Sequence, residues 1–92
     1  MAEHCEKIVG EFSIYTAAAL KPKLLEALAA ASALSLDLSG VTEIDSAGIQ
    51  LLLLLKRETL KSGSELRLTG SNPVVDEALA LCNLTGLFNP ES

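Results

Sequence analysis

The residues that could do chemistry lie together where an expected strand passes into an expected helix. Asp45, Ser46, Ala47 and Gly48 follow an alternating segment over residues 34–39 and precede a run of leucines. Asp and Ser are both favoured N-cap residues, so a helix is expected to begin here. Its unpaired backbone N–H groups and the positive end of its dipole favour a phosphate. Ser46 therefore has two interpretations, a helix cap or a phosphate acceptor.

The other reactive side chains are too few and too scattered for catalysis or for a metal. The only histidine, His4, is close to the N-terminus, and the two cysteines, Cys5 and Cys82, are far apart in sequence. A histidine-assisted nucleophile would need His4 beside Ser46 or beside a cysteine, and these residues lack the spacing of metal ligands. No glycine-rich phosphate loop occurs. We expect no catalytic residue, no cofactor and no metal; a small enzyme of unknown type is the weakest alternative.

Composition and charge narrow the class of partner. The chain has 92 residues, 49% of them apolar and 3% aromatic, with 7 basic and 12 acidic side chains and a net charge of -5. This is enough for one small domain with a core of Leu, Ala, Val and Ile. The acidic balance argues against nucleic acid and against an anionic membrane surface. We expect a cytoplasmic protein without membrane insertion. The two thiols should be reduced, and the sequence has neither a signal-peptide core nor an apolar run long enough to span a membrane.

Hydrophobic periodicity predicts strands and helices in alternation. We expect a loose N-terminal segment over residues 1–6, a short edge strand over residues 7–12, and a helix capped by Thr16. Pro22 is awkward within that helix because proline removes a backbone hydrogen bond. The helix should therefore have a loose first turn from Ala17 and then a firm body to about Ala31.

In the second half of the chain, hydrophobic periodicity predicts the remaining strands and helices. A buried strand over residues 34–39 leads through a polar turn to a leucine-rich helix that ends at residues 62–64. A strand is expected over residues 65–69, then a helix with Pro73 in its first turn and a short last strand around residues 84–88. Alternating strands and helices imply a parallel or mixed sheet in a compact α/β sandwich.

Periodicity also separates buried from exposed positions. Strand alternation and the apolar arc of the leucine-rich helix direct five side chains inward: Leu36, Leu38, Ile44, Leu52 and Leu55. Leu60 falls on the same helical arc. Leu54 falls instead among Gln50 and other polar residues, so we expect it to be exposed and available to a partner.

The segment LDLSGVTEIDSAGI, residues 36–49, resembles the signature of STAS domains, the family of bacterial anti-sigma-factor antagonists. In that family a strand ends in Asp-Leu-Ser, a short loop follows, and Asp-Ser-Ser/Ala-Gly opens a helix. The resemblance extends over about residues 9–88. It implies an α/β fold with a mixed sheet of about four strands packed against three or four helices, as a single STAS domain over residues 1–92 with residues 89–92 loose.

The family's phosphorylated serine falls on Ser46. The resemblance therefore implies a non-enzymatic signalling switch that binds an anti-sigma factor or a related serine kinase and releases it on phosphorylation, with a phosphatase resetting it. Phosphate adds about −1.5 to −2 charges beside Glu43 and Asp45, so charge rather than refolding would be the signal. The partner-binding residues we expect are Ser13, Tyr15, Thr42, Glu43, Asp45, Ala47, Gly48, Ile49, Gln50 and Leu54.

Other interpretations remain beside this one. Sporulation-type antagonists have an acidic residue where Ser13 stands in GEFSIYTA, so the chain resembles more closely the STAS proteins encoded beside chemotaxis-like genes. Other STAS proteins are subunits of bacterial ABC lipid transporters and bind the ATPase, and Asp-Ser-Ala-Gly does not exclude them. For Gly48 the alternative to partner contact is close packing on the sheet. The oligomeric state is left open.

Overall fold

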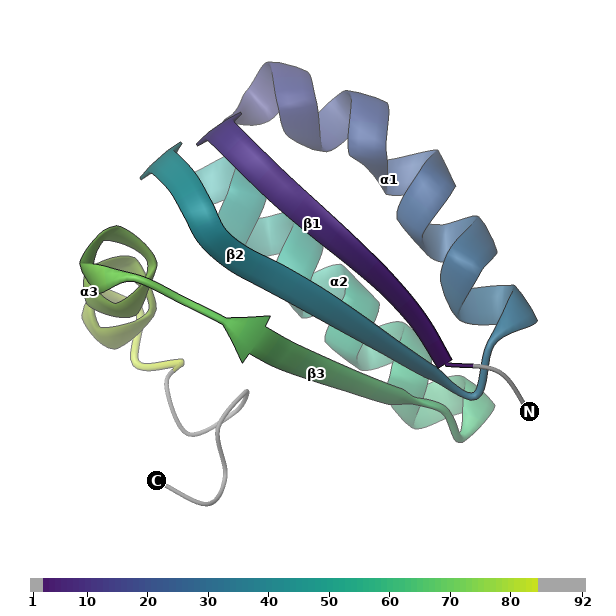
Figure 1. Cartoon of the computed structure of the whole chain (residues 1–92). Coiled ribbons are helices and arrows are strands. Elements are labelled where there is room, and N and C mark those ends of the chain that lie inside the picture. The colour runs from purple at the N-terminus through teal and green to yellow at the C-terminus, as the bar shows by residue number, and fades with distance from the viewer. Residues whose placement is uncertain (1–2, 85–92) are drawn as a thin grey trace.

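The computed structural model describes residues 3–84, which form three strands and three helices in strict alternation (Figure 1). The strands lie in the order β1-β2-β3, and both neighbouring pairs are parallel. The bounds of the elements are β1 Glu3–Phe12, α1 Ile14–Ala30, β2 Ala33–Ile44, α2 Ser46–Ser62, β3 Glu65–Gly70 and α3 Pro73–Leu81.

The predicted α/β fold is confirmed, with a simpler sheet than expected. The described residues contain three parallel strands, in place of a mixed sheet of about four. The strand predicted over residues 84–88 lies outside the described residues except for Leu84, which is not in a strand. The strands are parallel because each helix carries the chain back along the sheet, so that every strand begins at the same end of the sheet.

Helices α1 and α2 lie side by side against one face of the sheet, and α3 packs against β2 near the end of the molecule where β1 and β2 end (Figure 1). The core lies between the sheet and the helices, and it includes Val75 and Leu79 of α3 as well as residues of α1 and α2. Four of the five side chains predicted to be buried have an exposed fraction of 0%, namely Leu36, Leu38, Leu52 and Leu55. The fifth, Ile44, is half-buried because it stands at the end of β2.

The first strand is longer than its sequence pattern suggests. The prediction that residues 1–6 are loose is wrong for residues 3–6, which pair in parallel with β2 from Glu3 opposite Ala33 to Glu6 opposite Leu36. Few apolar side chains mark this stretch because β1 lies at the edge of the sheet. Hydrogen bonds to β2 form it, and such long-range pairing leaves no local signal.

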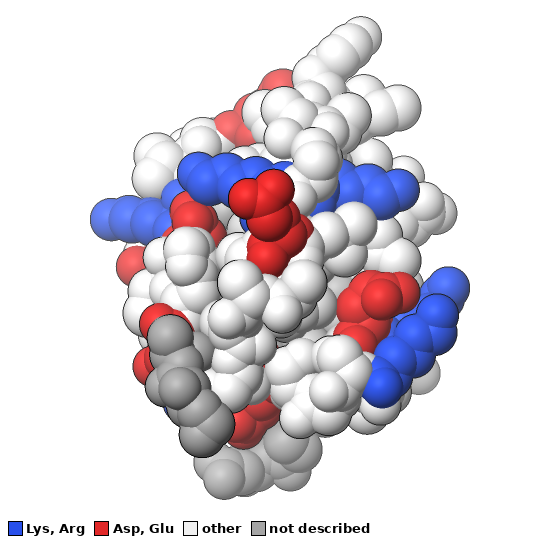
Figure 2. All heavy atoms as spheres, turned by 90° about the vertical axis from the view of Figure 1, so that its right-hand side faces the viewer, with Lys and Arg blue, Asp and Glu red and all other residues white. Residues whose placement is uncertain are grey.

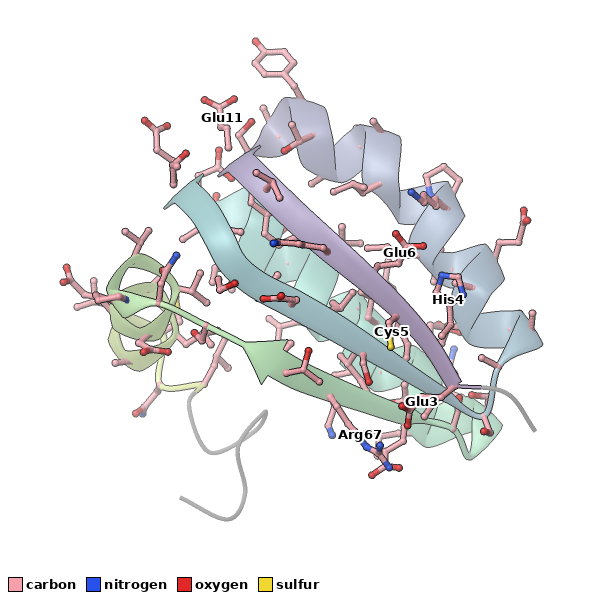
Figure 3. All side chains as sticks on the ribbon, viewed as in Figure 1. Glu3, His4, Cys5, Glu6, Glu11 and Arg67 are labelled. Atoms are coloured by element: carbon pink, nitrogen blue, oxygen red, sulfur yellow. The ribbon has the colours of Figure 1, made fainter. Side chains whose placement is uncertain are left out.

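Polar contacts on both faces hold this end of β1. On the uncovered face, Arg67 of β3 reaches over β2 to Glu3, with an Nη1–Oε2 distance of 2.7 Å (Figure 3). Ser35 lies on β2 between these strands and is only 3% exposed. On the helix face, Glu6 contacts both His4 and Lys23 of α1. The hydrogen bond from His4 and the nearby Lys23 ammonium hold the pKa of Glu6 below its usual value, against the opposing effect of burial.

Helix α1 begins earlier than predicted and runs through its proline. Ser13, not Thr16, is the N-cap; the Thr16 hydroxyl accepts a hydrogen bond from the Ser13 backbone N–H at 2.8 Å and donates one to the Glu11 carbonyl at 2.8 Å. The predicted loose first turn is therefore wrong. Pro22 and Ala18 are both exposed, so water can satisfy the carbonyl that the proline leaves without a donor.

The predicted arc of α2 is wrong at two leucines. Leu54 is half-buried and packs against the core, because α1 lies along that side of α2. Leu60 was expected inside but is 75% exposed, since no residue in the described part of the chain covers that side of the last turn. A helical wheel gives the direction of each side chain, but the position of the neighbouring helix determines which directions are covered.

Candidate functional site

The carboxyl ends of β1 and β2 meet at one end of the molecule, where α1 and α2 begin (Figure 1). Phe12, the last residue of β1, is paired with Ile44, the last residue of β2. The Phe12 carbonyl also accepts a hydrogen bond from the Asp45 N–H at 3.3 Å. Two segments far apart in sequence, Ser13 to Tyr15 and Asp45 to Gly48, are therefore brought to the same end of the molecule.

Asp45 caps α2, and Ser46 does not. The Asp45 Oδ1 accepts hydrogen bonds from the backbone N–H groups of Ala47 at 2.9 Å and Gly48 at 3.3 Å. Ser46 is the first helical residue, is exposed, and its hydroxyl has no hydrogen-bond partner among residues 3–84. The interpretation of Ser46 as the side chain that caps the helix is therefore wrong. Its hydroxyl is therefore exposed beside the N-terminus of α2 and, within residues 3–84, is not used by the cap.

Because Asp45 and not Ser46 caps α2, replacing each residue by alanine should change the free energy of unfolding by different amounts. Asp45→Ala should lower the free energy of unfolding by about 0.5–2 kcal/mol, because two N–H groups at the start of α2 lose their acceptor. Ser46→Ala should change it by less than about 0.5 kcal/mol, as expected for an exposed side chain without contacts. Urea denaturation of the two variants measures both values. A larger loss for Ser46→Ala than for Asp45→Ala would assign the cap to the serine.

Gly48 is required by close packing of the sheet on α2. It is buried, and a Cβ there would lie 2.7 Å from the Phe12 carbonyl oxygen and 3.1 Å from the Ile44 Cγ1. The end of β1 can approach α2 only because this position has no side chain. Ile49 is also buried, with 7% of its surface exposed. Neither residue lies on the surface, so both can act on a partner only by positioning their neighbours.

Most of the other predicted contact residues lie on the surface at this end. Those that are exposed are Tyr15, Thr42, Glu43, Asp45, Ser46 and Gln50, and those that are half-buried are Ser13, Ala47 and Leu54. Tyr15 is 81% exposed, which is unusual for an aromatic residue in a chain with so few. The structure thus brings together residues from the starts of both helices and the end of β2.

Two residues that the sequence did not single out belong to the same surface. Glu11 lies at the end of β1, at the end of the sheet opposite Glu3 and Arg67 (Figure 3), and its Oε1 accepts a hydrogen bond from the Ser13 hydroxyl at 2.8 Å. Ile14 is 60% exposed at the start of α1. The Gly10-Glu11 pair at the start of GEFSIYTA could have pointed to Glu11. Nothing in the local pattern marked Ile14, whose exposure depends on how α1 sits on the sheet.

The chemistry available here is that of a hydroxyl among carboxylates. Glu11, Glu43 and Asp45 are all exposed at this end of the molecule. Among residues 3–84 no group of three or more His, Cys, Asp or Glu side chains is placed to hold a metal ion. Cys5 and Cys82 are exposed and not bonded to each other. Within the same residues no helix has the length and apolar character needed to cross a bilayer.

A match to a protein-family model shows the family of this chain. The model described as "Mlab, STAS domain" matches residues 7–89, which is most of the chain. The chain belongs to the STAS domain family. The predicted family is confirmed, and Ser46 lies at the start of α2 of a STAS fold. Among curated protein sequences none is similar enough to count as a match.

Solved structures support the fold at low sequence identity. The unphosphorylated anti-sigma factor antagonist SpoIIAA is 20% identical, with a TM-score of 0.78 over 91% of this chain and 74% of that one. SpoIIAA from Bacillus in its phosphorylated form is 19% identical, with a TM-score of 0.73 over 91% and 77%. A sulfate transporter family protein from Wolinella succinogenes is 24% identical, with a TM-score of 0.82 over 97% and 73%. The same STAS fold therefore occurs in an antagonist and in a transporter protein.

Proposed function

We propose that this STAS domain is a phosphorylation-controlled binding protein, with Ser46 as the phosphate acceptor and the surface around it as the partner site. In this role it is a substrate and a ligand, not a catalyst. Unphosphorylated, it binds an anti-sigma factor or a related serine kinase in the cytoplasm; phosphorylated, it releases that partner; a phosphatase restores binding. The observation that carries the proposal is the exposed hydroxyl of Ser46 beside a cap that Asp45 supplies.

The local geometry lets a phosphate be added without unfolding the helix. Because Asp45 already satisfies two N–H groups of α2, phosphorylation of Ser46 removes no capping hydrogen bond. The start of a helix also favours negative charge. The new charges would stand beside Glu43 and Asp45, which are exposed. A partner that accepts a neutral hydroxyl there would meet a dense negative patch, and like charges brought together at an interface cost binding energy.

The relatives support this reading of the site. SpoIIAA is an anti-sigma factor antagonist whose structure is known in both unphosphorylated and phosphorylated forms. This chain superimposes on both, with TM-scores of 0.78 and 0.73. A phosphorylated STAS fold is therefore compatible with the architecture described above.

Phosphate incorporation and partner release test the proposal. Incubated with ATP and an extract of its native cells, the purified chain should gain one phosphate on Ser46, located by mass spectrometry of its peptides. Ser46→Ala should gain none, whereas Ser39→Ala, which removes another exposed serine, should be modified as the wild type is. Ser46→Asp should fold normally but capture much less of the partner than Ser46→Ala does. Phosphate on another residue, or equal capture by both variants, would contradict the switch.

A second candidate function is a constitutive subunit of a transporter that binds the transporter's ATPase. It is favoured by the matching family model, whose description begins with Mlab, and by the transporter protein among the structural relatives. This function predicts no phosphate on Ser46. It also predicts that Ser46→Ala and Ser46→Asp capture the same ATPase equally, so the experiment above separates the two functions.

A further inference from the structure

An open groove of about 600 Å³ runs between α1 and α2 and begins beside Ala47, next to Ser46. Among the ten residues that line it, three of each helix follow the spacing i, i+4, i+7, which places them on one face of that helix. They are Ile14, Ala18 and Lys21 from α1 and Gln50, Leu54 and Arg57 from α2. Ile14, Ala18 and Leu54 form the apolar part of these two stripes, and the other three side chains are polar or charged.

The groove continues beyond these residues. A second hollow of about 380 Å³ shares Lys21 and Leu54 with the first and is lined further along by Leu25 and Leu28 of α1. From Ile14 to Leu28 the two hollows extend over fifteen residues of α1, or about 21 Å at 1.5 Å rise per residue. This length corresponds to about four turns of a helix laid into the groove.

Two basic side chains line the first hollow of this acidic chain. Lys23, Lys61 and Arg67 each contact a carboxylate, at 3.3, 3.7 and 2.7 Å. Lys21 and Arg57 are exposed on opposite sides of the groove, and neither has a carboxylate partner within residues 3–84. Figure 2, which views the side of the molecule where α1 lies, shows basic and acidic side chains interspersed on this face. Among the described residues, Lys21 and Arg57 are therefore the charged side chains of the first hollow, whereas Glu58 lines the second.

We propose that this groove binds an amphipathic helical segment of the protein partner, with apolar side chains on the face that meets Leu54 and carboxylates that meet Lys21 and Arg57. The inference rests on the proposed function, because it takes the partner to be a protein and the start of the groove to be the surface around Ser46. The apolar floor selects the apolar face of the segment. Lys21 and Arg57 select the charge of the segment and set its position along the groove.

A synthetic peptide provides the probe. It is an eighteen-residue helix with Leu at the i, i+3, i+4, i+7 positions and Glu on the flanks; matched peptides replace every Glu by Lys, or every Leu by Ser. Titrated into the ¹⁵N-labelled full chain, the Glu peptide should shift the amide signals of Ala18, Gln50 and Leu54, with a measurable Kd. Both matched peptides should bind at least about tenfold more weakly.

Charge reversal on the protein tests the two cations. Lys21→Glu and Arg57→Glu should each weaken the Glu peptide about tenfold. Lys56→Glu makes the same change in net charge on α2 but lies outside both hollows, so it should alter the Kd by less than about twofold, the remainder of a screened long-range field. Circular dichroism of each variant confirms that the fold is kept. Equal losses for Arg57→Glu and Lys56→Glu, amide shifts on another face, or no binding of the Glu peptide would overturn the proposal.

Two further measurements separate the alternatives. If sedimentation shows a dimer that Arg57→Glu dissociates, a second copy of the chain occupies the groove and the proposal is wrong. Phosphorylation of Ser46 is measured on a chain with an unaltered groove. A phosphate on Ser46 without peptide binding would therefore overturn the groove alone, and peptide binding without that phosphate would overturn the switch alone.

Discussion

Leu52→Ala is expected to lower the free energy of unfolding by about 2–5 kcal/mol, the largest stability effect that we predict for one substitution. Leu52 has an exposed fraction of 0%, and its helix packs against the sheet. Removing its side chain loses apolar burial and leaves a cavity that the close-packed surroundings fill only in part. Urea denaturation followed by circular dichroism measures the change.

Leu60→Ala is the matched control, because it makes the same chemical change on the same helix. Leu60 is 75% exposed, so its truncation should cost less than about 0.5 kcal/mol. Similar losses for the two variants would show that the rotation of α2 about its axis differs from the one described. A loss below about 0.5 kcal/mol for Leu52→Ala would have the same meaning.

Gly48→Ala is expected to destabilise the chain by about 1–3 kcal/mol through overpacking. At an ordinary helical position the same change would stabilise by about 0.5–1 kcal/mol, so the sign of the effect is the test. Here the new Cβ would lie 2.7 Å from the Phe12 carbonyl oxygen, which belongs to the backbone and cannot rotate away. The end of β1 or the start of α2 must therefore shift.

The same substitution should disturb the site as well as the stability. Gly48 lies two residues after Ser46, and the Phe12 carbonyl it faces also accepts the Asp45 N–H. Amide signals of Asp45 and Ser46 should therefore shift in Gly48→Ala, while Ser46→Ala leaves Phe12 unaffected. A more stable Gly48→Ala variant with unchanged signals at Asp45 would show that β1 does not approach α2 as closely as described.

Local pattern was enough for the central strand, the start of α2 and the order of the elements. Leu34, Leu36 and Leu38 alternate with polar residues, and all three are fully buried in β2. Asp45 is a favoured cap before a leucine-rich run, and it does cap α2. These features could be read from the sequence because each depends on residues within a few positions of one another. The STAS family follows from the same short segment, and the family model confirms it.

The local sequence pattern predicts the structure wrongly where a segment distant in sequence packs against the residues concerned. Glu3 to Glu6 form a strand because β2 pairs with them. Leu54 is half-buried because α1 lies beside it. The periodicity of one segment does not depend on which segment packs beside it in the sheet or in the next layer. It therefore predicts these positions wrongly.

What the sequence determines by itself is the sequence of strands and helices, the leucine core, and a serine after an aspartate at a helix start. The arrangement of the site comes from packing in three dimensions. The pairing of Phe12 with Ile44 brings Ser13 and Tyr15 to the end of the molecule that carries Ser46. The cap on Asp45 frees the Ser46 hydroxyl, and the α1–α2 contact forms the groove beside it. Each of these depends on contacts between residues more than thirty positions apart or on a competition between neighbouring side chains, and periodicity encodes neither.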